Sequence, residues 1–571
     1  MSRPQNSFWP DGVPETIEPP GSSLFSNLVN SANRQPDKAA LYFMGRTYSY
    51  GELLQAAERM AARLWKLGVQ PGDRVVVNMQ NCPQLIIAHF AVFRANAIVV
   101  PVNPMSRADE LLHYIVDSGS RVVIASADVA EQVAAADEKL GHPNKLRSMI
   151  VTRYTDAFDP DGKDVPVTPP AWKSWLYAEP ELPRLTAGDV MSWSEAVDNQ
   201  LPLPEIRIAA NDLAILPYTS GTTGAPKGCM HPHRTVNFNA MGMAIWTRVA
   251  AESVCLVAAP MFHVTGMISV MQASIFAGAS MVLMPRWDRQ AAGALISQFR
   301  VTHWINVPTM VVDLLSCPDI ASMDLSSLRF IGGGGAAMPQ AVAQKLLEQF
   351  GLKYCEGYGL TEAAAATHFN PLDRPKQQCM GIPYIGCDAR IIDPERRDEL
   401  PAGEQGEIVI HGPFLFQGYW GQADATSDIL IDIDGRSFLR TGDLGYVDED
   451  GYFYLTDRLK RMINASGFKV WPAEVETLMF RHPAIQEACV VSRHDDYRGE
   501  SVKAFVVLRS SHSGEVTEKD IIGWCRENMA VYKAPSSIEF LDVLPKTASG
   551  KVLWRLLQER EDRTRSEAIR Q

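Results

Sequence analysis

The chain has 571 residues, of which 46% are hydrophobic and 21% are charged. This composition is typical of a globular protein and excludes a disordered, collagen-like or coiled-coil chain. Lys and Arg number 54 against 66 Asp and Glu, and the formal net charge of −12 argues against nonspecific binding to nucleic acid or to an anionic membrane as the main task.

The start of the chain, residues 1–6, lacks the apolar run of a secretory signal. The most apolar stretch, residues 85–102, is interrupted by His89, Arg94 and Asn96, so we predict a buried helix and strand there and no membrane span. The nine cysteines include no C-x-x-C pair, which favours a reducing compartment. We therefore expect a cytoplasmic protein without a transmembrane segment.

Helical spacing in residues 50–67 alternates with short β-branched runs at 74–78 and 121–124. This alternation predicts parallel sheets covered by helices, which is an α/β fold. Residues 156–183 are rich in proline and aspartate, and we interpret them as a long surface excursion. Further strands, each ending where α/β folds bind ligands, are predicted at 213–216, 253–258, 280–283 and 328–331.

After residue 400 the pattern changes to glycine-punctuated strands, which predict a small antiparallel β subdomain at 406–411, 445–448 and 452–455. We expect a boundary near Asp457. The last part of the chain predicts a compact α+β unit with helices at 473–481 and 518–528, strands at 485–492 and 502–508, and a final helix.

Residues 218–228 (YTSGTTGAPKG) directly follow the apolar run 213–216. Glycines let successive backbone N–H groups converge on phosphate oxygens, hydroxyls add donors and the lysine adds positive charge. The loop is not a Walker A motif, because Pro226 precedes Lys227 and Gly228 follows it. The pattern predicts a polyphosphate site formed by Thr219, Ser220, Gly221, Thr222, Thr223, Gly224 and Lys227.

With this loop the chain resembles the adenylate-forming superfamily, which includes acyl-CoA synthetases, the adenylation domains of nonribosomal peptide synthetases and firefly luciferase. The similarity extends from about residue 25 to residue 560, and further motifs occur in the family's order. The resemblance implies that a carboxylic acid is activated by ATP and Mg²⁺ to an acyl-AMP. The acyl group then passes to the thiol of CoA, and AMP and pyrophosphate are released.

The resemblance also implies which residues bind the nucleotide. In residues 358–362 (YGLTE), Tyr358 is expected to stack on adenine, Thr361 to meet the α-phosphate, and Glu362 to hold Mg²⁺ together with Thr219. Asp443 is the expected ribose clamp, because one carboxylate can accept hydrogen bonds from two vicinal hydroxyls. Missing side chains at the nearby glycines would let the flat base approach the backbone, and the remaining nucleotide contacts are expected at Gly334, Gly335, Glu356 and Gly357.

Two further motifs imply a moving part. Residues 457–460 (DRLK) resemble the family's interdomain hinge, with Arg458 reaching ribose or phosphate and Lys460 as the pivot. Residues 545–551 (PKTASGK) resemble the catalytic-lysine loop, in which Lys551 bridges the attacking carboxylate and the α-phosphate. The implied domains are an N-terminal adenylation domain, 1–459, and a C-terminal mobile lid domain, 460–571, that rotates between the two half-reactions.

Residues 260–266 (PMFHVTG) resemble the acyl-CoA synthetase segment that borders the substrate carboxylate and the pantetheine tunnel. His263 is the expected gate, and a buried structural histidine is the alternative. Relatives that adenylate amino acids carry an aspartate here, so His263 disfavours a substrate with an ammonium group. The expected pocket walls are residues 264–267, 303–307 and the alanines 363–366, which leave apolar volume unless they begin a helix packed against the sheet.

These features favour an acyl-CoA synthetase for a hydrophobic acid of medium or long chain, with an aromatic or phenylpropenoic acid as the second choice. Asn464 stands where many fatty-acid-activating relatives have a second lysine, which weakens the long-chain assignment. Contacts to CoA are expected at Lys469, Tyr532 and Lys533, unless these are solvated surface.

Other functions fit the sequence less well. An enzyme that loads a carrier-protein phosphopantetheine is the main alternative, and it would turn over weakly with free CoA. No motif supports light emission, and the intact motifs argue against a non-catalytic nucleotide sensor. No nucleic-acid partner is expected, whereas a homodimer is compatible with the resemblance because similar proteins commonly dimerise through the large domain.

Overall fold

The computed structural model describes residues 8–159, 168–219, 226–458, 461, 463–465, 468–470, 472–495, 499–509, 512, 514, 516–546 and 552–570. The chain forms two units, of which the first comprises residues 1–388 and 410–439 and the second residues 389–409 and 440–571. Within the described ranges, no helix is both long enough and apolar enough to cross a membrane.

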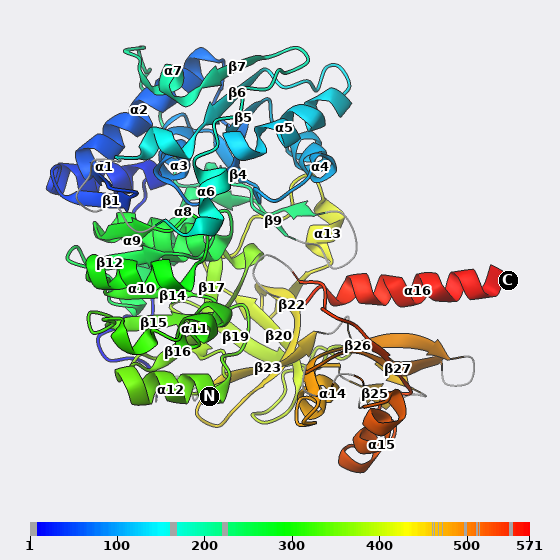
Figure 1. The fold of residues 1–571 in the computed structure, drawn as a ribbon. Coiled ribbons are helices and arrows are strands. Elements are labelled where there is room, and N and C mark those ends of the chain that lie inside the picture. Colours follow the sequence, from blue (N-terminus) through cyan, green and yellow to red (C-terminus); the bar gives the residue numbers. More distant parts are fainter. Residues whose placement is uncertain are drawn as a thin grey trace. The chain divides into compact units, whose positions relative to one another are not determined.

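A mixed sheet forms one layer of the first unit (Figure 1). Its central strands pair in parallel, and antiparallel strands complete both edges. In spatial order the strands are β18 (Ile382–Pro383), β17 (Ala365–Phe369), β16 (Tyr354–Leu360), β15 (Phe330–Gly333), β14 (His303–Asn306), β12 (Val254–Val257), β13 (Ser280–Leu283), β1 (Ala39–Phe43) and β2 (Arg46–Ser49).

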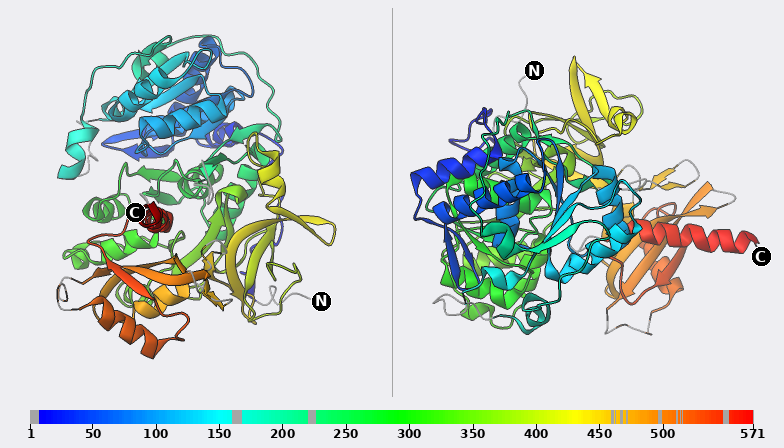
Figure 2. Two further views of the ribbon diagram at one scale, coloured as in Figure 1. Left: turned by 90° about the vertical axis from the view of Figure 1, so that its right-hand side faces the viewer. Right: turned by 90° about the horizontal axis from the view of Figure 1, so that it is seen from above.

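The second sheet of this unit is parallel except at one edge, where β11 pairs antiparallel with β8. Its order is β11 (His231–Pro232), β8 (Leu213–Ile215), β4 (Ile98–Pro101), β3 (Arg74–Asn78), β5 (Val122–Ser126), β6 (Ser148–Thr152) and β7 (Asp189–Ser192). Figure 2 shows this sheet, coloured from blue through cyan to green, with helices packed against it.

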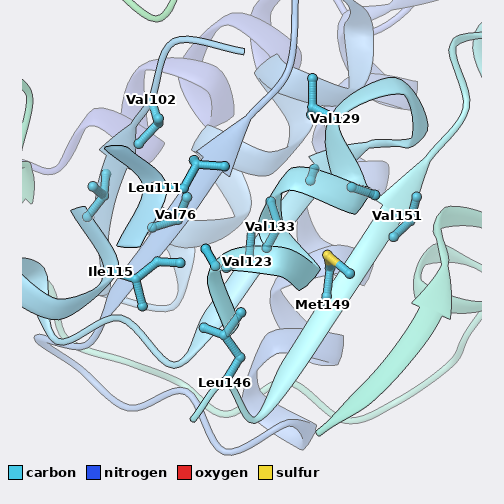
Figure 3. Packing of buried hydrophobic residues seen from close by; sticks show 14 of the residues in the cluster. Val76, Val102, Leu111, Ile115, Val123, Val129, Val133, Leu146, Met149 and Val151 are labelled. Carbon is cyan, nitrogen blue, oxygen red and sulfur yellow. The ribbon is translucent and has the colours of Figure 1, made fainter. Parts of the chain in front are cut away.

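Buried side chains join this sheet to α4 (Ala108–Ser118) and α5 (Ala127–Lys139). Leu111 and Ile115 of α4 and Val133 of α5 gather around Val123 and Met149 of the sheet (Figure 3). The spacing of apolar residues along each helix therefore determines which face it buries. Helix α4 ends at Gly119, whose φ of +66° is the left-handed conformation that glycine adopts without strain.

The other helices of the first unit follow the predicted α/β alternation. Helix α2 (Tyr50–Lys66) begins with a capping box, in which the Ser49 side chain accepts from the Glu52 N–H and the Glu52 carboxylate accepts from the Ser49 N–H. The remaining helices include α1 (Leu24–Arg34), α3 (Pro83–Arg94), α7 (Trp193–Val197), α8 (His233–Trp246), α9 (Ala273–Ala277), α10 (Arg289–Gln298), α11 (Pro308–Leu315) and α12 (Gln340–Phe350). The predicted fold class is confirmed.

The predicted surface excursion is partly wrong. Residues 160–167 of it lie outside the described residues, but α6 (Pro170–Leu176) follows them and buries Trp172 and Leu176. The guanidinium of Arg286 lies 3.8 Å from the ring centroid of Trp175. Proline-rich composition concealed a short helix whose aromatic side chains pack on the rest of the unit.

The small antiparallel sheet predicted after residue 400 is present. Its order is β19 (Asp388–Ile392), β20 (Gly406–His411), β22 (Arg436–Val447) and β21 (Leu430–Ile433), and β23 (Phe453–Arg458) pairs with β22. A short helix, α13 (Ala423–Ser427), precedes β21.

The last part of the chain is an α+β arrangement with its own apolar core. The sheet order is β25 (Phe468–Val470), β24 (Ile463–Ala465), β27 (Gly499–Leu508) and β26 (Ile485–Asp495), with β28 (Ser537–Phe540) paired to β27. The helices are α14 (Pro472–Met479), α15 (Glu518–Asn528) and α16 (Trp554–Arg570). The predicted domain boundary between residues 459 and 460 marks where the rotating part of the chain is expected to begin, and it stays a prediction.

Candidate active site

The two stems of the predicted phosphate loop form a short hairpin. Strand β9 (Tyr218–Thr219) pairs antiparallel with β10 (Lys227–Gly228), so that Thr219 stands opposite Lys227. The loop residues between the stems, Ser220, Gly221, Thr222, Thr223 and Gly224, lie outside the described residues. The hairpin brings the predicted metal-side threonine and the predicted phosphate-binding lysine together at the base of the loop.

Helix α4 holds both stems. The Tyr218 hydroxyl donates to Asp117 Oδ2 at 2.6 Å, and His113 Nε2 donates to the Pro226 carbonyl oxygen at 2.8 Å. Burial, reinforced by the bond to Asp117, raises the pKa of Tyr218, so its hydroxyl stays a donor. His113 and Asp117 were missed from sequence, because a lone histidine and aspartate on an amphipathic helix carry no motif.

The YGLTE segment forms the end of β16 and a 3₁₀ turn, Thr361–Ala363. The Glu362 carboxylate accepts from the Tyr419 hydroxyl at 2.7 Å, and the Thr361 carbonyl accepts from His231 Nε2 at 2.7 Å. Tyr358 is half-buried, with its ring 5.8 Å from that of His368. The backbone of this segment is therefore fixed by side chains that sequence reasoning did not identify.

The alternative in which the alanines begin a helix is wrong. Ala364 and Ala365 have φ values of +50° and +96°, and strand β17 starts at Ala365. Asn239 Nδ2 donates to the carbonyls of both Ala363 and Ala366 at 3.0 Å and holds this turn. Left-handed alanines are strained and persist where surrounding contacts determine the backbone.

Glu356 is buried in β16, and its partners are backbone amides. Its carboxylate accepts from the Gln378 N–H at 2.6 Å and from the Met338 N–H at 3.2 Å. Burial raises the pKa of Glu356 to about 7, against the opposing effect of these hydrogen bonds. A nucleotide contact at Glu356 stays a prediction.

The glycines predicted to admit the base are also required by strand packing. A Cβ at Gly334 would lie 2.2 Å from the Gly357 carbonyl oxygen, and a Cβ at Gly357 would lie 2.5 Å from the Phe369 ring. Gly335 has open space beside it but a φ of +90°. Backbone geometry therefore restricts all three positions before any ligand is considered.

In the second unit, Asp443 is almost fully buried within β22, next to a segment held by side-chain hydrogen bonds. The Thr441 hydroxyl donates to the Ile408 carbonyl at 2.7 Å and accepts from the Asp443 N–H at 3.1 Å. Glu407 accepts from the Gly442 N–H at 3.2 Å and from Arg440 Nη2 at 2.6 Å. Glu407 was missed from sequence, because its role comes from contacts across the sheet.

The predicted hinge and catalytic-lysine residues are only partly described. Arg458 pairs through its backbone with Asp443, and nothing is described of its side chain. Lys460 and Lys551 lie outside the described residues. Among the expected CoA contacts, the Lys533 ammonium pairs with Glu474, and Tyr532 is exposed. The side chain of Lys469 is not described.

His263 lies between β12 and a π-helix, Thr265–Gln272. Its side chain is open to solvent, yet the surrounding protein desolvates the imidazole and lowers its pKa. Because His263 is exposed, it does not fit the alternative interpretation of a buried structural histidine. Its gating role stays a prediction.

One of the three expected acyl-wall regions, residues 303–307, lines a cavity of about 10 Å³. Residues 264–267 and 363–366 are not among its lining residues. Ser269 and Val270 of the π-helix line it from one side, and His303 and Ile305 of β14 line it from another. His303 Nε2 donates to the Thr247 carbonyl at 3.0 Å, so its imidazole is already engaged. The lining is mainly apolar.

Comparison with known proteins gives two matching family models. One, described as AMP-binding enzyme, matches residues 28–420, and one described as AMP-binding enzyme C-terminal domain matches residues 474–551. The long-chain-fatty-acid–CoA ligase of Bacillus subtilis (strain 168) is 36% identical, covering 98% of each chain. A feruloyl-CoA synthase of an Amycolatopsis species is 34% identical, covering 92% of this chain and 96% of the relative.

Among solved structures, ATP-bound MatB from Rhodopseudomonas palustris matches with a TM-score of 0.80 at 27% identity. The match covers 95% of this chain and 99% of that one.

Glu356 gives the site a testable pH dependence. Its folded pKa of about 7 exceeds the unfolded value of about 4.3, so its contribution to stability is present below pH 4.3 and is lost as pH rises to 7. We expect Glu356→Gln to reduce the fall in melting temperature between pH 5 and pH 8 by a few degrees. Thermal unfolding of both proteins without ligands measures this, and an unchanged pH slope would contradict it.

Proposed function

The chain belongs to the AMP-binding enzyme family and is an AMP-forming acid–CoA ligase, and we propose that its acid is a hydrophobic fatty acid of medium or long chain. ATP and CoA are its co-substrates. The reaction has two halves, in which the carboxylate first attacks the α-phosphorus of ATP, releasing pyrophosphate, and the CoA thiol then displaces AMP from the acyl-AMP.

One observation carries the choice of substrate. The relative that matches nearly the whole of this chain at 36% identity is a long-chain-fatty-acid–CoA ligase. A phenylpropenoic acid is the second candidate, since the feruloyl-CoA synthase is 34% identical.

We assign the nucleotide to the motif residues. Thr219, the loop residues 220–224 and Lys227 bind the phosphates, Thr361 meets the α-phosphate, and Tyr358 stacks on adenine. Asp443 and Arg458 bind the ribose. The base also meets the backbone at Gly334, Gly335, Glu356 and Gly357, and side chains at Gly334 and Gly357 would clash with neighbouring atoms.

We further propose that Mg²⁺ is bound by Glu362 together with Thr219 and the ATP phosphates. Within the described ranges, no group of three or more His, Cys, Asp or Glu side chains is arranged to hold a metal ion. One carboxylate completed by substrate phosphates is a common arrangement for Mg²⁺, and the oxygen donors of Glu362 and Thr219 fit it. When bound, Mg²⁺ offsets the negative charge of the phosphate oxygens.

Lys551 acts in the first half-reaction, where it brings the two anions together, and His263 acts as the gate between the acyl and pantetheine sites. Residues 460–571 rotate about Lys460 between the halves. A cytoplasmic location fits the nine cysteines, none of which forms a disulfide in the described part of the chain. A homodimer stays a prediction.

The substrate proposal is tested by AMP release with butyrate, octanoate, palmitate, benzoate and a phenylpropenoic acid, with and without CoA. We expect the highest kcat/KM with octanoate or palmitate and a requirement for CoA. A maximum with an aromatic acid would contradict the proposed substrate but leave the proposed reaction unchanged. Pyrophosphate release that does not depend on CoA would indicate another acyl acceptor.

A larger side chain at Val270, beside the expected wall residues His303 and Ile305, should shorten the acids that the enzyme accepts. Val270→Phe adds more volume than the cavity offers, so the ring must displace neighbouring atoms. We expect kcat/KM with palmitate to fall about tenfold or more relative to butyrate. Val133→Phe, in a buried cluster of the other sheet, is the matched control and should leave the ratio unchanged. An unchanged ratio in Val270→Phe would remove this cavity from the acyl site.

The two half-reactions should separate at Lys551. Lys551→Ala should abolish adenylation, because the lysine bridges the two reacting anions, while thioester formation from added acyl-AMP stays within a few-fold of wild type. Pyrophosphate release and CoA-dependent consumption of acyl-AMP measure the two halves separately. Equal loss of both half-reactions would contradict the proposed rotation of residues 460–571.

A further inference from the structure

We propose that Tyr419 is a positioning residue that links the metal-side carboxylate of Glu362 to the phosphate-side ammonium of Lys227. The inference rests on the proposed function, because Glu362 and Lys227 receive their roles there. Tyr419 belongs to no motif identified from sequence, yet it contacts both groups in the same unit of the structure.

The hydroxyl group and the aromatic ring of Tyr419 each make one of the two contacts. Its hydroxyl donates to Glu362 Oε1 at 2.7 Å, and the Lys227 ammonium nitrogen lies 5.0 Å from the centroid of its ring. The second distance is that of a cation–π interaction. Only 8% of Tyr419 is exposed, while Glu362 and Lys227 are half-buried.

The backbone fixes Tyr419 relative to both partners. The Trp420 N–H donates to the Gly228 carbonyl at 2.8 Å, and the Met230 N–H donates to the Gly418 carbonyl at 3.0 Å. These bonds align residues 418–420 with the strand that leaves the phosphate loop. On the other side, the Phe416 N–H donates to the Glu362 carbonyl at 2.9 Å.

This arrangement suits a residue that orients a metal ligand. A carboxylate has about four lone-pair positions, so one hydrogen bond to Oε1 restricts its rotation and leaves acceptor capacity for a cation. Hydrogen bonds to ligating carboxylates typically contribute about 10- to 100-fold to metal affinity. The ring holds the Lys227 ammonium close to the base of the phosphate loop, so one side chain constrains the charges on both sides of the triphosphate.

Tyr419→Phe tests the hydroxyl alone, because the ring remains. We expect the affinity for Mn²⁺, measured by electron paramagnetic resonance with a non-hydrolysable ATP analogue, to fall about tenfold. Binding of the analogue without metal should stay within about twofold. The Mg²⁺ concentration for half-maximal adenylation should rise in parallel, while kcat at saturating Mg²⁺ changes little.

Tyr419→Leu removes the ring as well, and it should weaken metal-free binding of the analogue by about threefold or more. Tyr50→Phe is the matched control, since it removes a buried hydroxyl that donates to the Ala279 carbonyl at 2.7 Å. It should lower the melting temperature without changing Mn²⁺ affinity.

Glu362→Gln separates this inference from the proposed function. If it weakens Mn²⁺ binding while Tyr419→Phe behaves as wild type, the role of Tyr419 is overturned and that of Glu362 stands. If Glu362→Gln leaves Mn²⁺ binding unchanged, both are overturned. Equal loss of metal-dependent and metal-free binding in Tyr419→Phe would show a purely structural tyrosine and would also overturn the inference.

Discussion

The parallel pairing of β14, β15 and β16 is the constraint on which the nucleotide-side residues depend. In this register Asn306 pairs with Gly333, and Gly333 pairs with Glu356. A Cβ at Gly333 would lie 1.8 Å from the Asn306 carbonyl oxygen, so a side chain there would force the strands apart. Parallel strands end at the same edge of a sheet. Gly334, directly after β15, and Tyr358, near the end of β16, therefore lie at neighbouring positions along that edge. Backbone geometry, more than contacts between side chains, brings these motifs together.

Elements with strong local signals could be predicted from the sequence. Strands β3 and β13 and helix α15 have the predicted bounds, since short apolar runs and a capping box at Thr517 are local features. The alanine run has an equally strong local signal for a helix, but its conformation is set by Asn239, more than 100 residues away in sequence. Tertiary hydrogen bonds overrode helix propensity there.

The residues of the site also fall into those that the sequence could suggest and those that it could not. Motif residues such as Glu362 and Asp443 could be proposed as site residues because whole loops resemble those of a family. Tyr419, Asp117 and Glu407 could not, because each acts through contacts with distant segments that leave no spacing pattern in the sequence. The net charge of −12 also gives no information about how individual acids of the site are stabilised. The buried carboxylate of Glu356, for example, accepts hydrogen bonds from backbone amides. Amide donors solvate this acid locally without the help of a cationic side chain.

Acyl selectivity depends on geometry that residue types do not encode. Apolar walls discriminate weakly, since one methylene changes relative rates by only about 10- to 200-fold. The π-helix Thr265–Gln272 contributes Ser269 and Val270 to the cavity, opposite Ile305 of β14. A π-helix is rare, and its wider turn places side chains at angles that an α-helix would not give. A return to α-helical register would move Ser269 and Val270 together, so the shape of this cavity depends on the backbone irregularity. Apolar residue types such as Val270 and Ile305 are equally compatible with an aliphatic chain and with an aromatic ring.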